Sequence, residues 1–229
     1  MIKNIIIIRH IVIIIAMLLL SCTGITAPES ASSAEDLQIW RKASKTFVFE
    51  CNNTFSFVAR VDGDAVWLFL PHKTLRLIRE PSASGEKFSD SQTIFWSKGD
   101  SALLEYNQTT YRNCMNNRTR AIWEHAKLNG VDFRAVGNEP GWFMEIRDAE
   151  SILFVADYGN SRYEFKAPQP MVDQKKRKTI YQTKAGEKNL TVVIEGRHCT
   201  DSMSGENFET TVWVQLDRNR YQGCGRALH

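Results

Sequence analysis

The sequence has almost no excess of one charge over the other. Its 229 residues carry 29 Lys and Arg against 26 Asp and Glu, which gives a formal net charge of +3 at pH 7. Lys3 and Arg9 lie in the first 21 residues, which contain no acids, so the chain without that segment carries only +1. Phosphate binding needs a surplus of cations on one face, so this chain is a poor candidate for a nucleic-acid binder.

The sequence also lacks a hydrophobic run long enough for a membrane-spanning helix. The apolar run at residues 11–20 is uninterrupted, but Arg9 and His10 divide it from the isoleucines before it. A helix that crosses ~30 Å of hydrocarbon needs about 20 apolar residues. Hydrophobic residues make up 43% of the chain and charged residues 24%, values that exclude general disorder, collagen and a multi-span membrane protein.

Two further absences bear on chemistry. No close Cys-x-x-Cys or His-x-x-x-His pair accompanies His198 and Cys199, which disfavours a metal site there. There is also no Gly-x-Ser-x-Gly elbow and no Ser-x-x-Lys on a predicted helix, two settings in which a serine is activated as a nucleophile. We therefore expect no metal, no cofactor and no enzymatic activity.

The first 21 residues have the features of a secretory signal: early basic residues, an apolar stretch and a small residue. The ending Leu19-Leu20-Ser21-Cys22 resembles the bacterial lipobox, although Leu20 is bulkier than the residue usual there. This resemblance implies that Cys22 is lipidated and begins the mature protein, and Thr23 after it implies the outer membrane, most simply its periplasmic side. Several acyl chains hold a protein on a membrane without spanning it. The alternative is an uncleaved signal anchor with an incidental cysteine.

Cysteine usage predicts two disulfides. Four cysteines remain once Cys22 is lipidated, an even number in an oxidising periplasm: Cys51, Cys114, Cys199 and Cys224. Three pairings are possible, and we favour the one in which each bond stays within one half of the chain, Cys51 with Cys114 and Cys199 with Cys224. In the chain-entropy model these loops stabilise the fold by ~4 and ~3.5 kcal/mol.

Residues 22–39 are rich in Ser, Ala, Thr and Pro and have no apolar period, a composition typical of a flexible tether. Short β-type runs follow within a first domain predicted at 40–117, where Asp62-Gly63 favours a hairpin turn. These runs lie at residues 46–49, 55–61, 65–70, 74–78, 93–96 and 102–106.

A helix is predicted at 119–129, within a linker at 118–130, with Ile122, Ala126 and Leu128 on its apolar face and Gly130 as its stop. The second domain, at 131–229, again consists of short strands, with Trp142 and Trp213 expected in its core. Its predicted strands lie at 133–136, 142–146, 152–156, 163–165, 179–182, 190–195, 210–216 and 221–224. The fold class is therefore all-β, with two small antiparallel barrel or sandwich domains joined by a short helix.

Two short segments of the first domain stand out as a candidate site. Residues 82–88 form a Ser- and Gly-rich loop, and residues 95–102 form a strand that ends in a Lys-Gly-Asp turn. Hairpin geometry can bring both to one end of a sheet, which places the Ser84 hydroxyl beside the Lys98 ammonium. Three interpretations remain open from the residue types: ordinary solvated turns, a serine nucleophile activated by lysine, or a binding edge for an acidic cleft.

From residue 47 to residue 114 the chain resembles the membrane-bound inhibitors of c-type lysozyme. The resemblance consists of a cysteine after the first strand, a Ser-Ala-Ser-Gly loop with an aromatic three residues on, a Trp-x-Lys-Gly turn, Ala-x-Leu and a closing cysteine. It implies a small antiparallel β-barrel with one disulfide that inserts Ser84 and Lys98 into the lysozyme cleft. Phe88 departs from the tyrosine common in the family, so a contact made by that hydroxyl is not carried over.

Lysozyme chemistry agrees with this implication. Lysozyme uses two carboxylates, one protonated and one ionised, in a locally negative cleft. Lys98 can pair with the ionised group while Ser84 donates a hydrogen bond. Acidic residues at the rim either speed the encounter with a cationic lysozyme or simply keep the barrel soluble: Glu80, Glu86, Asp90 and Asp100.

The second domain is less informative. Residues 133–142, 199–205 and 223–226 resemble an uncharacterised domain of bacterial envelope lipoproteins, which implies a location but no chemistry. Glu139 and Asp201 are either a catalytic carboxylate pair or solvated loop acids. The predicted function is a lipoprotein inhibitor of c-type lysozyme. The alternative is an envelope-anchored binding or structural module that holds a glycan or small ligand and does not inhibit lysozyme.

Overall fold

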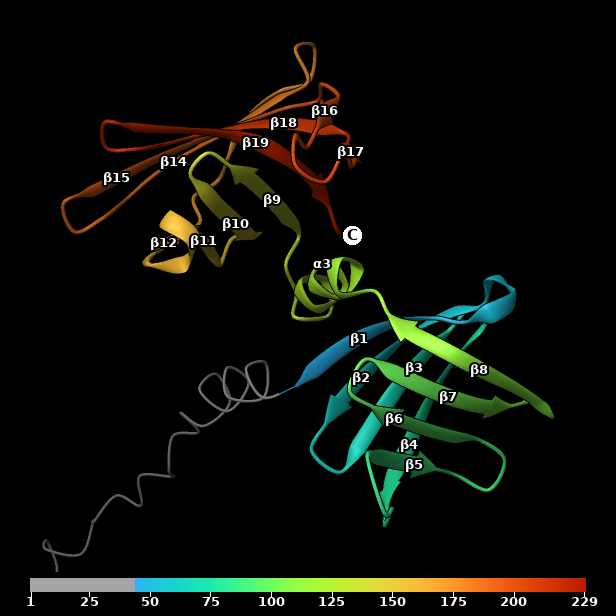
Figure 1. Ribbon diagram of the computed structural model, residues 1–229. Coiled ribbons are helices and arrows are strands. Elements are labelled where there is room, and N and C mark those ends of the chain that lie inside the picture. The colour runs from blue at the N-terminus through green and yellow to red at the C-terminus, as the bar shows by residue number, and fades with distance from the viewer. Residues whose placement is uncertain (1–43) are drawn as a thin grey trace, which may run out of the picture. The chain divides into compact units, whose positions relative to one another are not determined.

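The computed structural model describes residues 44–229, and most of them lie in β-strands (Figure 1). The predicted signal peptide at 1–21, the lipidation site Cys22 and the tether at 22–39 lie outside the described residues and stay predictions. No helix in the described part of the chain is long and apolar enough to cross a membrane.

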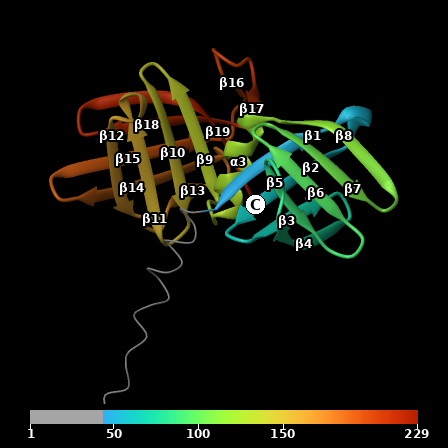
Figure 2. The same cartoon turned by 60° about the horizontal axis from the view of Figure 1, so that its bottom comes forward.

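Eight antiparallel strands form a closed barrel, in which β1 pairs with both β2 and β8 (Figures 1 and 2). Their side chains alternate between the interior and solvent, most regularly in β2. The strands are β1 (Lys45–Glu50), β2 (Ser56–Asp62), β3 (Ala65–Leu70), β4 (Lys73–Glu80), β5 (Glu86–Ser89), β6 (Ile94–Lys98), β7 (Ser101–Tyr106) and β8 (Thr109–Asn116), with a 3₁₀ turn, η1 (Asn52–Thr54), between β1 and β2.

Phenylalanine rings fill the interior of the barrel. Four rings are buried there: Phe49, Phe57, Phe88 and Phe95. The centroid of the Phe95 ring lies 5.7–6.1 Å from those of the other three. An eight-stranded barrel is just wide enough for side chains to fill. Phe88, which stands where tyrosine is common in the family, is therefore a residue of the barrel core.

One helix, α3 (Arg118–Leu128), follows the barrel. The Asn117 side chain caps it by accepting the Arg120 N–H at 3.0 Å, and Gly130, at φ +75°, ends it as expected. The predicted apolar face is partly wrong, because Ile122 is 53% exposed while Trp123 and Ala126 are buried. The face is set by packing of Trp123 against Phe208, with ring centroids 5.4 Å apart, rather than by the helix alone.

Nine of the eleven strands that follow form one antiparallel sheet that curls into a half-barrel, in the order β12-β11-β10-β9-β19-β18-β15-β14-β13. Strands β16 and β17 form a separate two-stranded sheet, and the short turn η2 (Asp157–Gly159) lies between β11 and β12. The strands are β9 (Phe133–Asn138), β10 (Gly141–Arg147), β11 (Ser151–Ala156), β12 (Ser161–Lys166), β13 (Met171–Asp173), β14 (Lys178–Ala185), β15 (Lys188–Glu195), β16 (Cys199–Thr200), β17 (Asn207–Phe208), β18 (Thr210–Leu216) and β19 (Asn219–Ala227).

The all-β fold class is confirmed, but one core assignment in the second sheet is wrong. Trp142 is buried and contacts the rings of Phe154 and Tyr221, whereas Trp213 is 40% exposed. On β18 the neighbours Val212 and Val214 point into the core, so the alternation of the strand turns Trp213 outward.

Both expected disulfides are present, Cys51 with Cys114 in the barrel and Cys199 with Cys224 in the second half. The first joins the end of β1 to β8, the two strands that close the barrel. The domain boundaries drawn at 40–117, 118–130 and 131–229 stay a prediction.

Candidate functional site

The Ser84 loop connects β4 to β5 and is held by two hydrogen bonds within the barrel. The Ser82 hydroxyl donates to the carbonyl of Gly85 at 3.0 Å, and the Trp96 indole N–H donates to the carbonyl of Ser84 at 2.8 Å. Trp96 lies on β6, whose residue Ser97 pairs with Glu86 directly after the loop. The loop is therefore fastened to the strand that leads into the Lys98 turn.

Gly85 allows this loop to lie against β6. Its φ of +71° is in the left-handed region, and a Cβ there would overlap the carbonyl oxygen of Ser97 and lie 3.2 Å from the Cβ of Lys98. The backbone next to Ser84 consequently touches the residue that carries the candidate cation. Ser84 and Lys98 are both exposed and line one hollow of about 340 Å³.

The Lys98 turn joins β6 to β7 and is anchored through Asp100. The Asp100 carboxylate pairs with Arg118 and accepts the Asn116 side-chain amide at 3.1 Å, while its carbonyl accepts the Asn116 N–H at 2.8 Å. Hydrogen bonds from Arg118 and then Asn116 lower the pKa of Asp100, so it is ionised at neutral pH. Lys98, in contrast, forms no ion pair within residues 44–229.

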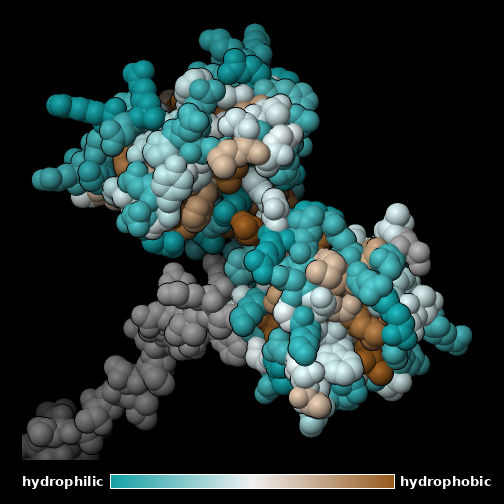
Figure 3. All heavy atoms as spheres, in the orientation of Figure 1, coloured by the Kyte–Doolittle hydropathy of each residue, from teal (hydrophilic) through white to brown (hydrophobic). Residues whose placement is uncertain are grey.

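The floor of the hollow is apolar. Trp96 is 42% exposed and Met115 is 53% exposed, and Leu103 lies between their strands on β7. Figure 3 shows hydrophobic side chains reaching the surface of the barrel among hydrophilic ones. An exposed aromatic beside polar groups is the composition found at protein interfaces.

The four acids predicted at the rim all have partners within the barrel. Glu80 forms an ion pair with Lys87 at 2.9 Å, and Glu86 forms one with Arg79 at 2.9 Å. A hydrogen bond from Ser89 and then one from Lys87 lower the pKa of Glu80. Asp90 accepts the N–H groups of Gln92 and Thr93 at 2.8 and 2.7 Å. These contacts indicate that the acids hold the loops of the barrel in place. Because their charges are paired, they contribute little to a long-range field that would attract a cationic lysozyme.

The geometry does not form an activated serine. No hydrogen bond joins the Ser84 hydroxyl to Lys98 in the described part of the chain, whereas a nucleophile needs a base within reach. The described residues also contain no group of three or more His, Cys, Asp and Glu side chains that could hold a metal ion.

In the second half, Glu139 and Asp201 line a common hollow of about 330 Å³. Asp201 is 8% exposed and accepts hydrogen bonds from the Asn138 amide at 2.7 Å and from the Ser204 N–H and hydroxyl at 2.7 and 2.8 Å. Burial raises the pKa of Asp201, but these hydrogen bonds outweigh it and the net pKa is lowered. Asp201 is thus a loop-ordering residue, not a proton donor at neutral pH.

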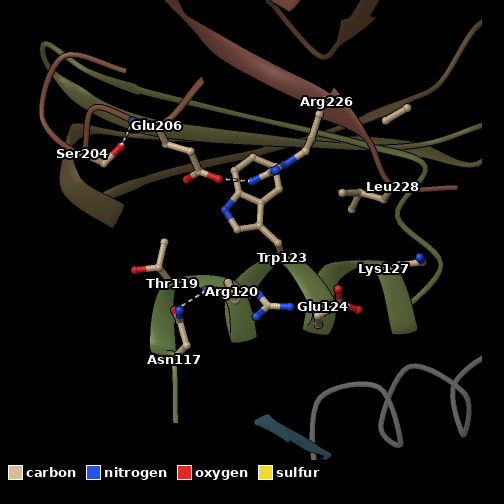
Figure 4. A pocket seen from close by; sticks show the side chains of 11 residues that line it. Asn117, Thr119, Arg120, Trp123, Glu124, Lys127, Ser204, Glu206, Arg226 and Leu228 are labelled. Atoms are coloured by element: carbon tan, nitrogen blue, oxygen red, sulfur yellow. Dashed lines mark hydrogen bonds and ion pairs between the residues drawn. The ribbon is translucent and has the colours of Figure 1, made fainter. Parts of the chain in front are cut away.

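A larger hollow, of about 640 Å³, lies between α3 and the end of β19 (Figure 4), and no sequence pattern predicts it. Arg226 stacks over the ring of Trp123 at 4.4 Å and donates to Glu206 at 2.5 Å. Because Trp123 lies about 80 to 100 positions before Glu206 and Arg226, no local pattern could have brought it to them.

Residues 49–113 match the family model described as membrane-bound lysozyme-inhibitor of c-type lysozyme (MliC). A protein of Yersinia enterocolitica serotype O:8 / biotype 1B, named membrane-bound lysozyme inhibitor of C-type lysozyme, is 35% identical over 71 residues, 31% of this chain. The match covers 61% of the length of that relative. No solved structure matches the chain. The barrel therefore contains an MliC-like segment, which runs from β1 to β8 and holds both the Ser84 loop and the Lys98 turn.

Proposed function

We propose that this protein inhibits c-type lysozyme by inserting the Ser84 loop and the Lys98 turn of its barrel into the active-site cleft. One observation carries the proposal: Ser84 and Lys98 are exposed together at one hollow inside the MliC-like segment. The protein acts as an inhibitor, not as an enzyme.

The chemistry of the two side chains fits the chemistry of the cleft. Lysozyme cleaves its glycan with a protonated carboxyl group and an ionised one. The ammonium of Lys98, which has no ion pair within residues 44–229, is available to the ionised carboxylate. The Ser84 hydroxyl is exposed and can donate to a carboxyl oxygen.

The anchored loops favour tight binding. The Trp96 N–H holds the carbonyl of Ser84, and Asp100 ties the Lys98 turn to Asn116 and Arg118. Preordered loops lose little conformational freedom on binding, which increases affinity.

Lipidation at Cys22 would place the barrel on the outer membrane, where lysozyme reaches the envelope. The name of the Yersinia relative describes a membrane-bound protein, which supports attachment to a membrane. We propose a lipid-anchored protein on the periplasmic side, with residues 22–39 as the tether.

The test is inhibition of a c-type lysozyme by a soluble version of the chain, residues 23–229, compared with Ser84→Ala and Lys98→Ala. We expect stoichiometric inhibition that falls at least tenfold in both variants, since truncating one partner of a buried charge-assisted pair typically costs ~2 to 5 kcal/mol.

Matched controls are available at the opposite end of the barrel. Lys73 follows the β3–β4 turn and Ser91 lies in the β5–β6 loop, and antiparallel strand order places both away from the Ser84 loop. Lys73→Ala and Ser91→Ala should inhibit like the unaltered protein. If the folded protein ignores lysozyme but retains cell-wall glycan fragments, the proposal is wrong and the chain is a glycan-binding module.

A further inference from the structure

Strand β8 contains a β-bulge at the hollow that holds Ser84 and Lys98. Cys114 pairs with Ala102 and Tyr111 pairs with Leu104, so Arg112 and Asn113 together face the single residue Leu103. Asn113 has a φ of +53°, in the left-handed region that asparagine tolerates better than most residues. A bulge of this kind changes the direction in which a side chain points.

The bulge brings a second cation to the hollow. Arg112 is exposed and lines the same 340 Å³ space as Ser84, Lys98 and Trp96. Within residues 44–229, no carboxylate lies within ion-pair distance of Arg112 or of Lys98. Arg79 of the barrel and Arg118 at the start of α3, in contrast, have acidic partners.

We propose that Arg112 is a second cationic contact of the inhibitory surface, paired with a carboxylate of the lysozyme cleft other than the one that Lys98 meets. This inference rests on the proposed function. The partner surface is then a cleft that carries at least two carboxyl groups around an apolar wall.

The surroundings of Arg112 increase the effect of its charge. Trp96, Leu103 and Met115 form an apolar floor, and covering it would exclude water from both cations. A cation that loses water without gaining a carboxylate destabilises the complex, so the surface discriminates against partners that lack the second acid. The planar guanidinium of Arg112 also suits a two-point contact with a carboxylate, which an ammonium cannot make.

The test uses the full soluble chain and measures the lysozyme dissociation constant of Arg112→Gln and Arg112→Lys at low and moderate salt. We expect Arg112→Gln to bind at least tenfold more weakly and to show a smaller salt dependence than the unaltered protein. Arg112→Lys keeps the charge but not the two-point contact, so its affinity should fall between the two. Arg76→Gln, at an exposed barrel position on β4, is the matched control and should bind normally.

The outcomes separate the inference from the proposed function. If the unaltered protein binds and Lys98→Ala weakens binding, but Arg112→Gln does not, the role of Arg112 is refuted and the proposed function stands. If the unaltered, folded protein does not bind lysozyme, both are refuted. Thermal unfolding of each variant shows that a loss of affinity is not a loss of fold.

Discussion

At the scale of single residues, Gly85 decides whether the Ser84 loop can lie against β6. Gly85→Ala adds a methyl group that overlaps the Ser97 carbonyl at a φ of +71°. We expect a loss of stability of ~2 to 4 kcal/mol, from left-handed strain together with overpacking. Inhibition of lysozyme should fall with it, because the loop can no longer rest beside Lys98. Chemical denaturation and an inhibition assay measure the two effects.

Gly63 provides the matched control for the backbone strain. Its φ is +58°, but an added Cβ would meet nothing within 4 Å. Gly63→Ala should therefore cost only the strain, ~1 to 2 kcal/mol, and should leave inhibition unchanged. Equal losses in the two variants would show that contact with β6 is unimportant.

The residues of the site differ in how far the sequence could predict them. Hairpin geometry predicts that Ser84 and Lys98 lie at one end of a sheet, and in the structure both line one hollow. Arg112 was not predicted, because its direction depends on a bulge, and a bulge is set by pairing with β7 rather than by local composition.

At the scale of the element, α3 is joined to the barrel through His125. The imidazole contacts the Thr46 hydroxyl at 3.1 Å through Nδ1 and the Asn129 amide at 2.8 Å through Nε2. Arg60 donates to the Asn129 side-chain oxygen at 2.9 Å, which leaves the amide nitrogen of Asn129 to face His125. Nε2 must then accept a hydrogen bond, so the contact requires neutral His125.

Protonation of His125 should weaken this junction. Burial and then the charge of Arg60 lower its pKa, with Glu145 opposing and Arg134 adding to the shift. A histidine whose pKa is lower in the folded state than in the unfolded state stabilises the fold. Its contribution is fully present above the unfolded pKa of ~6.5. That stability is lost as the pH falls from there through the lowered folded pKa, because the unfolded chain binds the proton more readily.

We predict that the free energy of unfolding of the unaltered protein falls between pH 7.5 and 5.5. The fall should be smaller in His125→Gln, because glutamine does not titrate. Urea denaturation at several pH values measures it, and His198→Gln, at an exposed position, serves as the control. A fall of equal size in the His125→Gln variant would contradict a role for this histidine.

The elements were predicted best where alternation was regular. Strands such as β2, β3 and β10 have clear inside–outside patterns, and the sequence located them within a few residues. It missed β5, which has four residues next to a Ser- and Gly-rich loop, and β8, which is polar and largely exposed. The pairing partners of these two strands hold them in the sheet, and a single-strand pattern does not show partners.

At the scale of the whole molecule, the curl of the second sheet and the hollow beside α3 were beyond sequence reasoning. Runs of alternating residues predict that strands exist but not whether a sheet closes. The barrel closes because β1 pairs with β8, whereas the nine-stranded sheet ends at β12 and β13. Trp123 and Arg226 meet only once both halves are folded.

The barrel has what it needs to fold without the second sheet. It closes on itself, has its own cluster of buried residues and its own disulfide, and contains the whole MliC-like segment. The barrel also contacts both ends of α3. Arg118 at the first end pairs with Asp100 of the barrel, and Arg60 of the barrel donates to the carbonyl of Leu128 at the other end at 2.6 Å.

We therefore predict that residues 44–130 fold and inhibit lysozyme within about threefold of residues 23–229, a difference of under ~1 kcal/mol. Residues 44–117 should be less stable and inhibit more weakly, because the Lys98 turn loses the Arg118 partner of Asp100 and Arg60 loses the end of the helix. Circular dichroism, thermal unfolding and inhibition of the three chains give the comparison. A folded 44–130 fragment that fails to inhibit would assign part of the lysozyme contact to the second sheet, whereas inhibition retained by 44–117 would show that α3 does not order the Lys98 turn.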